Sequence, residues 1–262
     1  MTSQHAPIIQ MKNIEKHFGS VIALAGVSLD IFPGECHCLL GDNGAGKSTF
    51  IKTMSGVHKP TKGEILFEGK RMDFADPRDS ITAGIATVYQ DLAMIPLMSV
   101  TRNFFMGNEP IRTIGPLKLF DHDYANKVTM KEMKQMGINL RGPDQAVGTL
   151  SGGERQTVAI ARAVHFGAKV LILDEPTSAL GVRQTANVLA TVDKVRKQGI
   201  AVVFITHNVR HALAVGDRFT VLNRGKTLGT AQRGQITPEE LQDLMAGGQE
   251  LVALEGSLGG TV

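Results

Sequence analysis

The sequence predicts an α/β protein with a central sheet that is largely parallel. Two continuous apolar runs, residues 169–173 and 200–206, are typical of strands buried on both faces, as the strands of a parallel sheet are. A third apolar run, residues 35–40, leads through a glycine-rich turn into residues 49–54, which have a helical pattern. Strands that alternate with helices in this way indicate the α/β class.

The composition is that of a globular chain that can bury a core. Of the 262 residues, 42% are hydrophobic and 20% are charged, and the net charge of +3 does not indicate nucleic-acid binding. No apolar run is long enough to cross a bilayer, and the first residues lack the pattern of a secretory signal. Cys36 and Cys38 are expected to be buried, reduced thiols, since two residues cannot complete a zinc site. These features predict a cytoplasmic protein.

The N-terminal segment predicts β structure. Residues 8–15 alternate weakly and are expected to form an edge strand, residues 16–20 a turn, and residues 21–31 a second strand. Phe18 lies in this turn, ahead of the glycine-rich motif. On sequence alone, packing in the core is favoured for its ring, and stacking on a base is the alternative.

Residues 41–48 have the spacing G-x-x-x-x-G-K-S of a phosphate-binding P-loop. Glycines let backbone N–H groups turn toward an anion, and the positive end of the next helix points at that anion. Lys47 is expected to reach the β- and γ-phosphates of a nucleotide, and the Ser48 hydroxyl to hold Mg²⁺. A chance match is the alternative, and the strand and helix on either side argue against it.

The next stretch contains two short strands and a loop. Residues 64–70 predict one strand, and residues 85–90 predict an apolar strand that ends on the polar Gln90. Residues 91–107 are rich in Met and Leu and are expected to form a loop. Its apolar side chains indicate either core or a docking surface.

Two helices are expected in the middle of the chain. Residues 121–136 have apolar side chains at helical spacing. A second helix follows Ser151, which predicts an N-cap, and Glu154 completes a capping box. Capping does not explain Gly152 and Gly153, since each glycine costs a helix about 1 kcal/mol relative to alanine. We therefore expect a group to approach the backbone there, and a phosphate would suit this helix N-terminus.

Three polar residues are expected at the carboxyl edge of the sheet. Asp174 and Glu175 end one of the long apolar runs, and His207 follows the other. Functional sites of parallel sheets lie at this edge, so Asp174 is expected to hold Mg²⁺ and Glu175 to act as a base on a water molecule. His207 shares the edge with Asp174 and Gln90, so a functional role and that of an ordinary polar residue are both open on the residue pattern.

The last part of the chain predicts a helix over residues 185–198, a hairpin around residues 223–225 and a final helix that begins at Pro238. The glycine-rich residues 247–262 are expected to be a loosely held tail.

Together these motifs resemble the nucleotide-binding domain of ABC transporters. The P-loop, Gln90, the run of residues 150–154, Asp174-Glu175 and His207 occur in the order typical of that family. Many ATPases share the P-loop, but the Leu-Ser-Gly-Gly-Glu signature at 150–154 is specific to ABC proteins. The stretches around Gln90 and after Asp174 are most similar to importers of simple sugars, the carbohydrate-uptake type.

The resemblance implies a fold and domain limits. We expect an α/β P-loop NTPase core of the ABC type with a mixed and partly parallel central sheet. We also expect an N-terminal antiparallel β subdomain and an inserted α-helical subdomain. The ATPase domain would cover residues 8–246, the helical subdomain about residues 91–165, and the flexible tail residues 247–262.

The resemblance also implies roles for particular residues. As catalytic residues it implies Glu175, which would polarise the attacking water, His207, which would position that water and hold the γ-phosphate, and Gln90, which would sense metal and water. The ligands implied for Mg²⁺ are Ser48, Gln90 and Asp174. The residues implied for ATP binding are Phe18 on the adenine, Ser151 and Gly153 on the nucleotide of the opposite subunit, and Gly41, Asp42, Asn43, Gly44, Ala45, Gly46, Lys47, Ser48 and Thr49.

The function implied is an ATPase that energises import of a monosaccharide, with fructose expected first and ribose, xylose or another sugar as alternatives. The expected partners are a second copy of this chain in the ATP-bound state, two membrane permease subunits and an extracytoplasmic sugar-binding protein, without nucleic acid. The expected location is the cytoplasmic face of the inner membrane, as a peripheral protein.

Two alternative functions are less consistent with the sequence, and one residue differs from the usual family pattern. A non-transport ABC ATPase of ribosomes or DNA usually has two ATPase domains or long coiled-coil insertions, and neither is expected here. A regulator without turnover would not need Asp174, Glu175 and His207. Gly181 stands where such proteins usually have an Asp that helps to couple the two subunits, so coupling differs from the family pattern while the metal ligand and the base are present.

Overall fold

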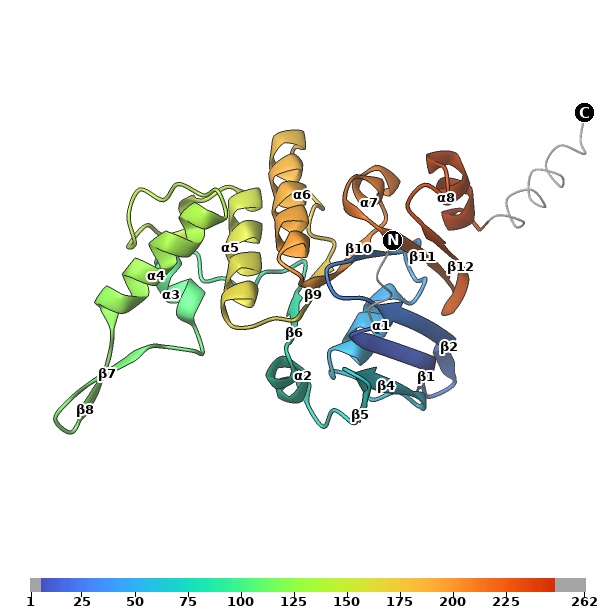
Figure 1. Cartoon of the computed structure of the whole chain (residues 1–262), viewed down its shortest axis with the longest axis horizontal. Coiled ribbons are helices and arrows are strands. Elements are labelled where there is room, and N and C mark those ends of the chain that lie inside the picture. Colours follow the sequence, from blue (N-terminus) through green and yellow to red (C-terminus); the bar gives the residue numbers. More distant parts are fainter. Residues whose placement is uncertain (1–5, 248–262) are drawn as a thin grey trace, which may run out of the picture.

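The computed structural model describes residues 6–247, in which a central sheet lies between an antiparallel β subdomain and a row of helices (Figure 1). A helical subdomain, which includes α3 (Val100–Phe105) and α4 (His122–Gln135), extends from one side of this core (Figure 1). The expected fold class, including the mixed sheet, is confirmed. Most of the predicted tail, residues 248–262, lies outside the described residues.

The central sheet has six strands in the order β12-β11-β3-β10-β9-β6. The strands from β11 to β6 pair in parallel, and β12 is antiparallel to β11. Their bounds are β3 Cys36–Leu40, β6 Ile85–Val88, β9 Val170–Asp174, β10 Ala201–Thr206, β11 Arg218–Asn223 and β12 Lys226–Gln232. The continuous apolar runs thus form β9 and β10 at the centre of the sheet, as predicted.

A second sheet is antiparallel, in the order β2-β1-β4-β5. Its strands are β1 Ile9–Phe18, β2 Val21–Ile31, β4 Lys62–Phe67 and β5 Lys70–Met72. The prediction of an edge strand for residues 8–15 is wrong, because β1 pairs with β2 on one side and β4 on the other. The strand also continues through the expected turn as far as Phe18, so that the turn is confined to residues 19–20.

The helices are short to medium in length. Their bounds are α1 Lys47–Met54, α2 Pro77–Ala83, α3 Val100–Phe105, α4 His122–Gln135, α5 Gly152–His165, α6 Val182–Lys197, α7 Val209–Val215 and α8 Pro238–Met245, with a 3-10 turn at Val147–Thr149. The capping box of Ser151 and Glu154 starts α5, as predicted, and Pro238 is the first residue of α8. Within residues 6–247, no helix is long and apolar enough to span a membrane.

Apolar side chains cover both faces of the central sheet. One face packs with α1 and the antiparallel sheet through residues such as Leu39, Ile172 and Phe50. The other face packs with α5–α8 through residues such as Phe204 and Leu173. Because both faces are covered, the sheet is held rigidly and its carboxyl edge is fixed in place.

The helical subdomain has its own apolar cluster, made by α3, α4 and α5 around Phe104, Met133 and Val158. The expectation of a loop for residues 91–107 is therefore only partly correct, since α3 lies within it and Phe104 and Phe105 are buried. Leu97 is 93% exposed, so this stretch has both a core part and a surface part.

A two-stranded hairpin, β7 Ile111–Ile114 and β8 Leu117–Phe120, was not among the predicted elements. It extends away from the helical subdomain in Figure 1. Its short strands give little periodic signal, and most of its residues are exposed.

A buried histidine lies in β3, the strand that leads to the P-loop. His37 is fully buried, its Nε2 is 2.8 Å from the Thr220 hydroxyl, and its Nδ1 is 3.5 Å from the Glu35 carboxylate. Burial lowers the pKa of His37, although Glu35 opposes the shift. Histidines of an unfolded chain titrate at about pH 6.5. The native state therefore takes up the proton on His37 only at a lower pH than the unfolded chain does.

We predict that the free energy of unfolding falls as the pH drops below about 6.5, because the unfolded state then binds more protons than the native state. Urea unfolding at pH 7.5 and 5.5, values on either side of about 6.5, measures the loss. A His37→Gln variant should lose less stability between these two values than the wild type. His122→Gln, at an exposed position on α4, should lose as much as the wild type. Equal losses in the His37→Gln variant and the wild type would contradict the prediction.

Candidate functional site

The carboxyl edge of the central sheet collects the predicted site residues. In register, Leu40 of β3 pairs with Thr206 of β10, and Asp174 of β9 pairs with Ile205 of β10. The P-loop, His207 and the pair Asp174-Glu175 therefore leave three adjacent strands at one edge. Gln90 leaves the next strand, β6, two residues after Val88, which pairs with Leu173.

The P-loop turns tightly between β3 and α1. Gly41 has φ +150°, and a Cβ built there would lie 2.4 Å from the carbonyl oxygen of Leu222, so only glycine fits. Gly46 is left-handed with φ +103° and begins α1 without any side-chain cap. The first turn of α1 thus presents backbone N–H groups that no described side chain caps, which is the arrangement that binds an anion.

Lys47 is held inside this loop. Its Nζ donates to the carbonyl oxygens of Gly41 at 2.6 Å and Asp42 at 3.0 Å, and the residue is only 8% exposed. Burial lowers the pKa of Lys47, while Glu175, Asp42 and Asp174 favour its charged form. A cation in this position supplies charge to a bound phosphate.

A cavity of about 430 Å³ opens over the P-loop. Its lining consists of residues 42–49 together with Val21, Ile22, Ala23 and Arg224. The size is that of a small-molecule or nucleotide pocket. The sequence did not single out Val21, Ile22 or Arg224, which reach the cavity from the β2 strand and from the turn between β11 and β12.

Phe18 does not line this cavity. Its ring is 44% exposed and packs edge-to-face on His58, with 5.2 Å between ring centroids, and the Lys16 ammonium lies 5.0 Å from its centroid. The ring is therefore partly exposed to solvent, and it is not the core side chain that the residue pattern alone favoured.

Asp174 and Glu175 lie close to Lys47. Burial raises the pKa of Asp174, as does the charge of Glu175, while Lys47 and Lys52 oppose the shift. Glu175 has φ +48°, a conformation rare outside glycine, and its N–H donates to the Ile205 carbonyl at 3.0 Å. Such backbone strain is concentrated at functional sites.

Glu175 and His207 are joined directly. The Nδ1 of His207 lies 2.9 Å from Oε1 of Glu175, although the residues are far apart in sequence. The His207 side chain is 62% exposed and the Glu175 side chain 15% exposed. The carboxylate is thus oriented by the imidazole at the base of an open site, which suits a group that acts on a water molecule.

A second histidine, which no sequence motif marks, supports this loop. Nδ1 of His211, on α7, lies 3.0 Å from the hydroxyl of the buried Thr177. Burial lowers the pKa of His211, as does His207, while Glu175 opposes the shift. The contact ties the loop after Glu175 to the helix after His207, so the two catalytic candidates are held relative to each other.

The signature residues lie elsewhere, at the N-terminus of α5. The Ser151 hydroxyl accepts from the N–H of Glu154 at 3.3 Å, and Glu154 accepts from the N–H of Ser151 at 2.8 Å. None of residues 150–154 lines the P-loop cavity. The close approach expected at the two glycines comes from this chain itself: a Cβ on Gly153 would lie 3.0 Å from Cβ of Gln184.

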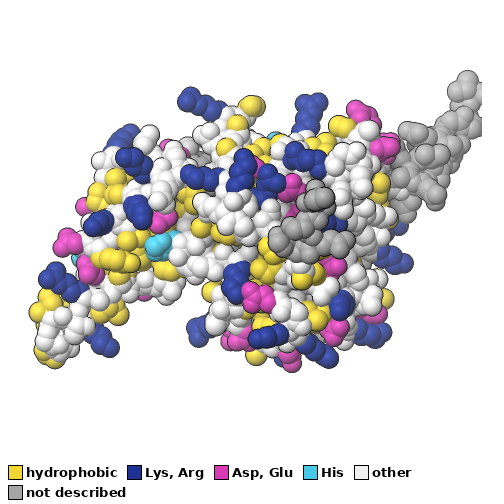
Figure 2. Space-filling model, in the orientation of Figure 1, with side chains coloured by type: hydrophobic (Ala, Val, Ile, Leu, Met, Phe, Trp, Pro, Cys, Tyr) yellow, Lys and Arg dark blue, Asp and Glu magenta, His cyan; other side chains and the backbone are white. Residues whose placement is uncertain are grey.

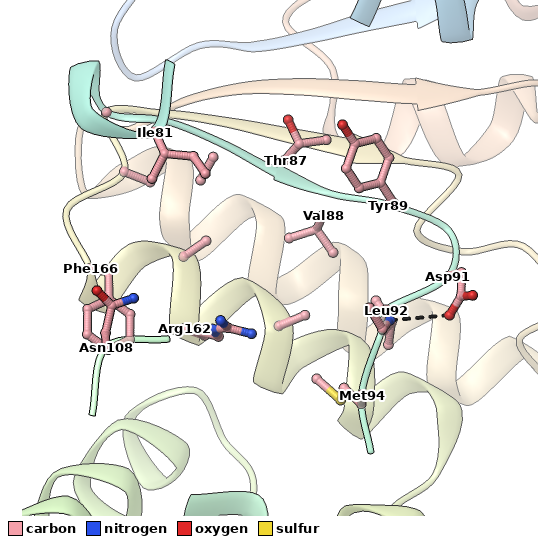
Figure 3. A pocket seen from close by; sticks show the side chains of 16 residues that line it. Ile81, Thr87, Val88, Tyr89, Asp91, Leu92, Met94, Asn108, Arg162 and Phe166 are labelled. Carbon is pink, nitrogen blue, oxygen red and sulfur yellow. Dashed lines mark hydrogen bonds between the residues drawn. The ribbon is translucent and has the colours of Figure 1, made fainter. Parts of the chain in front are cut away.

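A second cavity, of about 330 Å³, lies between β6, α2 and α5 (Figure 3). Tyr89 and Asp91, on either side of Gln90, help to line it, together with Met94, Arg162 and Phe166. Its wall is mostly apolar, and Asp91 accepts from the N–H of Ala93 at 3.2 Å. Gln90, which follows β6 at the edge of the sheet, therefore lies in the chain between two residues that line this cavity.

Comparison with known proteins identifies the family. Residues 24–178 match the family described as ABC transporter. The chain belongs to the ABC transporter family. As an ABC ATPase it binds and hydrolyses ATP, and residues 41–48, 150–154 and 174–175 lie within the matched segment.

Curated relatives of this ABC ATPase are import proteins. It is 43% identical over 242 residues to the xylose/arabinose import ATP-binding protein XylG of Sulfolobus acidocaldarius, covering 91% of this chain and 93% of the relative. It is 40% identical over 249 residues to the fructose import ATP-binding protein FrcA of Rhizobium meliloti, covering 93% and 95%. It is 40% identical to the ribose import ATP-binding protein RbsA 2 of Streptomyces avermitilis, covering 92% of this chain but only 47% of that relative.

Solved structures show the same fold. An ATP-binding cassette in its ADP conformation superposes with a TM-score of 0.80 at 24% identity, covering 96% of this chain and 100% of that one. A dimeric cassette in a post-hydrolysis state, bound to ADP and phosphate, superposes with a TM-score of 0.72 at 26% identity, covering 87% and 100%.

The packing at the signature glycines predicts different tolerance to alanine. Gly153→Ala places a methyl group against the backbone of Gln184, which cannot move aside. Gly152→Ala instead meets side-chain ends, that of Leu180 at 2.8 Å and that of Gln184 at 3.9 Å. Both variants gain the same helix propensity. We therefore expect Gly153→Ala to be less stable than Gly152→Ala by about 1–3 kcal/mol in urea unfolding. Equal stabilities would show that α6 yields to the added methyl group.

At Gly181, the N-cap of α6, we expect an added side chain to stabilise the protein, in contrast to Gly153. Its φ of −68° and ψ of 161° suit any residue, and a Cβ there meets nothing within 4 Å. Gly181→Asp adds a side-chain cap and a negative charge at the helix N-terminus. The free energy of unfolding of this variant should therefore exceed that of the wild type by about 0.3–1 kcal/mol. Gly181→Ala is the matched control and should be less stable than the wild type. The prediction fails if the Asp variant is no more stable than the Ala variant.

Proposed function

We propose that this chain is the ATP-hydrolysing subunit that energises import of a monosaccharide through a membrane permease. The relatives are import proteins for xylose or arabinose, for fructose and for ribose, which supports a sugar as cargo. Their identities of 43%, 40% and 40% do not separate these sugars. The proposal is therefore a monosaccharide, with fructose, ribose and xylose as candidates.

The proposal places one ATPase domain over residues 8–246, with the helical subdomain inserted at about residues 91–165. The separate apolar cluster of α3, α4 and α5 supports this division. The mixed sheet with its P-loop would bind nucleotide, and the helical subdomain would carry the signature.

The P-loop fits the phosphates of ATP. Residues 41–49 would surround them with backbone N–H groups, and Lys47 would release its bonds to the Gly41 and Asp42 carbonyls to reach the β- and γ-phosphates. Adenine would stack on the partly exposed ring of Phe18. The exposed ring and the nearby cavity of about 430 Å³ support this placement.

The donor groups at the sheet edge fit Mg²⁺. The described residues contain no cluster of three or more His, Cys, Asp and Glu that could hold a metal. Magnesium needs no such cage, since it takes one or two protein oxygens and completes its shell with phosphates and water. Ser48, Asp174 and Gln90 would provide these oxygens, and bound Mg²⁺ would neutralise charge on the phosphates.

The single observation that carries the proposed mechanism is the 2.9 Å contact between His207 Nδ1 and Glu175 Oε1. In phosphoryl transfer the protein contributes mostly orientation and charge stabilisation. Glu175 would accept a hydrogen bond from the attacking water and take its proton, while His207 keeps the carboxylate in place. Gln90, at the end of the neighbouring strand, would contact the same water.

The distance of the signature from the P-loop cavity supports a role for it in a dimer. Ser151 and Gly153 do not line the cavity of their own chain. We propose that they contact the nucleotide of a second copy, so that two ATP molecules hold two subunits together. The dimeric cassette with ADP and phosphate among the similar structures supports this arrangement. Hydrolysis would then weaken the pair, because the bound ligand is part of the interface.

The cavity beside Gln90 would receive the membrane subunits (Figure 3). Its mostly apolar wall suits a short helix or loop of a partner. A permease docked there would sense the state of the nucleotide site through Gln90, and it would place the chain at the cytoplasmic face of the inner membrane. An extracytoplasmic sugar-binding protein would complete the importer.

Glu175→Gln tests the proposal. The variant should retain ATP binding but lose hydrolysis by about 100-fold or more, since the amide cannot take a proton from water. With ATP and Mg²⁺, its mass in solution should double, measured by light scattering. Glu132→Gln is a matched control, because it also removes a carboxylate that faces a histidine, His165 at 3.4 Å, but far from the site.

Hydrolysis at the wild-type rate by Glu175→Gln would contradict the role of this residue as the base. A variant that stays monomeric with ATP would contradict the homodimer and indicate a different partner subunit. Co-sedimentation of the wild type with ribosomes, with no membrane protein captured, would favour a non-transport ABC ATPase.

A further inference from the structure

The β7–β8 hairpin has no part in the site described above. Its strands pair Ile111 with Phe120, Arg112 with Leu119, Thr113 with Lys118 and Ile114 with Leu117. Side chains of directly paired residues lie on the same face of an antiparallel ribbon. One face therefore carries Arg112, Ile114, Leu117 and Leu119, and the other carries Ile111, Thr113, Lys118 and Phe120.

The hairpin exposes aliphatic side chains on both faces. Ile111 is 60% exposed, Ile114 53%, Leu117 60% and Leu119 50%. Neighbouring exposed aliphatics on an element that projects from the molecule indicate a contact surface, in contrast to single apolar residues scattered on a protein surface.

Among residues 6–247, the packing contacts of the hairpin lie at its base. The Phe120 ring lies edge-to-face on His122, with 4.7 Å between ring centroids, and the Arg102 guanidinium is 5.7 Å from the Phe120 centroid. The tip stands clear of the body in Figure 1, and apolar side chains are visible there at the lower left of Figure 2.

The charges of the hairpin are all positive. Residues 111–120 contain Arg112 and Lys118 and no acidic residue. The nearest acids in sequence, Glu109 and Asp121, lie at the base and are used locally: Glu109 accepts from the N–H of Gly107, and Asp121 from the N–H of Tyr124. An anionic surface would therefore be attracted to the tip without repulsion from within the hairpin.

The hairpin projects on the side of the molecule that carries the second cavity. In Figure 1 it extends on the same side as α2 and the carboxyl end of α5, which supply Ile81 and Phe166 to the cavity assigned to the membrane subunit. Asn108 lines that cavity and lies three residues before β7. If the cavity faces the permease, as the proposed function has it, the hairpin tip points toward the membrane beside it.

We propose that the β7–β8 hairpin binds the headgroup region of an anionic lipid bilayer. Ile114, Leu117 and Leu119 would enter the boundary between headgroups and acyl chains, and Arg112 and Lys118 would contact lipid phosphates. Interfacial binding combines buried apolar area with attraction of cations to anionic lipids, and both are present here. A bilayer suits a narrow ribbon with apolar residues on both faces better than a protein partner does, because a stable protein interface needs a broad surface.

The test uses the full chain without nucleotide and two kinds of vesicle. One is pure phosphatidylcholine, and the other contains about 30% phosphatidylglycerol, at about 0.1 M salt so that charge attraction is not fully screened. Co-sedimentation should show that the wild type binds the anionic vesicles. A triple variant, Ile114→Ser, Leu117→Ser and Leu119→Ser, should bind them about tenfold or more weakly.

The charge variant Arg112→Gln with Lys118→Gln should lose the preference for anionic over neutral vesicles. Leu228→Ser, an exposed leucine on β12, is the matched control and should bind as the wild type does. All these variants alter exposed residues away from the ATP site and should keep the wild-type circular dichroism and ATP hydrolysis.

Failure of the wild type to bind any vesicle would overturn the proposal, as would equal binding by the triple variant. A further outcome would show that the hairpin contacts protein and that the lipid proposal is wrong. In that outcome the wild type does not bind vesicles, and the triple variant no longer co-purifies with the permease in detergent. If the wild type does not hydrolyse ATP, this result counts against the proposed function alone, because vesicle binding is measured without ATP.

Discussion

The hydrogen-bond register of β3, β10, β9 and β6 brings segments that are far apart in sequence to one edge of one sheet. The P-loop, His207, Asp174-Glu175 and Gln90 leave these strands side by side. Because apolar layers cover both faces of the sheet, the strands cannot slide without exposing core residues. The geometry of the site thus follows from strand pairing that was fixed by burial.

Local contacts then adjust individual groups at this edge. The left-handed backbone at Glu175 turns its carboxylate toward His207, and the contact between Thr177 and His211 holds the loop that follows. The Lys47 ammonium is held by two carbonyl oxygens of the P-loop. Charges of both signs are therefore gathered in a partly buried place at this edge of the sheet.

The N-terminus of α5 packs against α6, and in the proposed function it also contacts a second subunit. Its first glycines allow α5 to pack closely against the start of α6, as the approach of Gln184 to Gly153 shows. The same capped helix end is the part of the helical subdomain that the proposal presents to a second subunit. A close internal contact fixes the orientation of this end, and orientation is what a contact in trans requires.

Sequence reasoning succeeded where a local pattern has one physical explanation. The P-loop spacing, the capping box at Ser151 and the apolar runs of β9 and β10 each predicted their element. It failed where the outcome depends on distant neighbours. Residues 8–15 became an inner strand because β4 pairs beside them. The β7–β8 hairpin gave no periodic signal, and the close packing of Gly153 against Gln184 of α6 was not predicted.

The sequence by itself therefore determined the fold class, the motifs and the chemistry that their side chains can perform, because backbone turns, caps and strand burial are read from neighbouring residues. Only the tertiary structure decided which polar groups meet. The pairing of β9 with β10 joins Glu175 to His207, and no local rule predicts that distance. Likewise, the exposure of Phe18 and of the hairpin depends on what packs nearby, which only the folded chain defines.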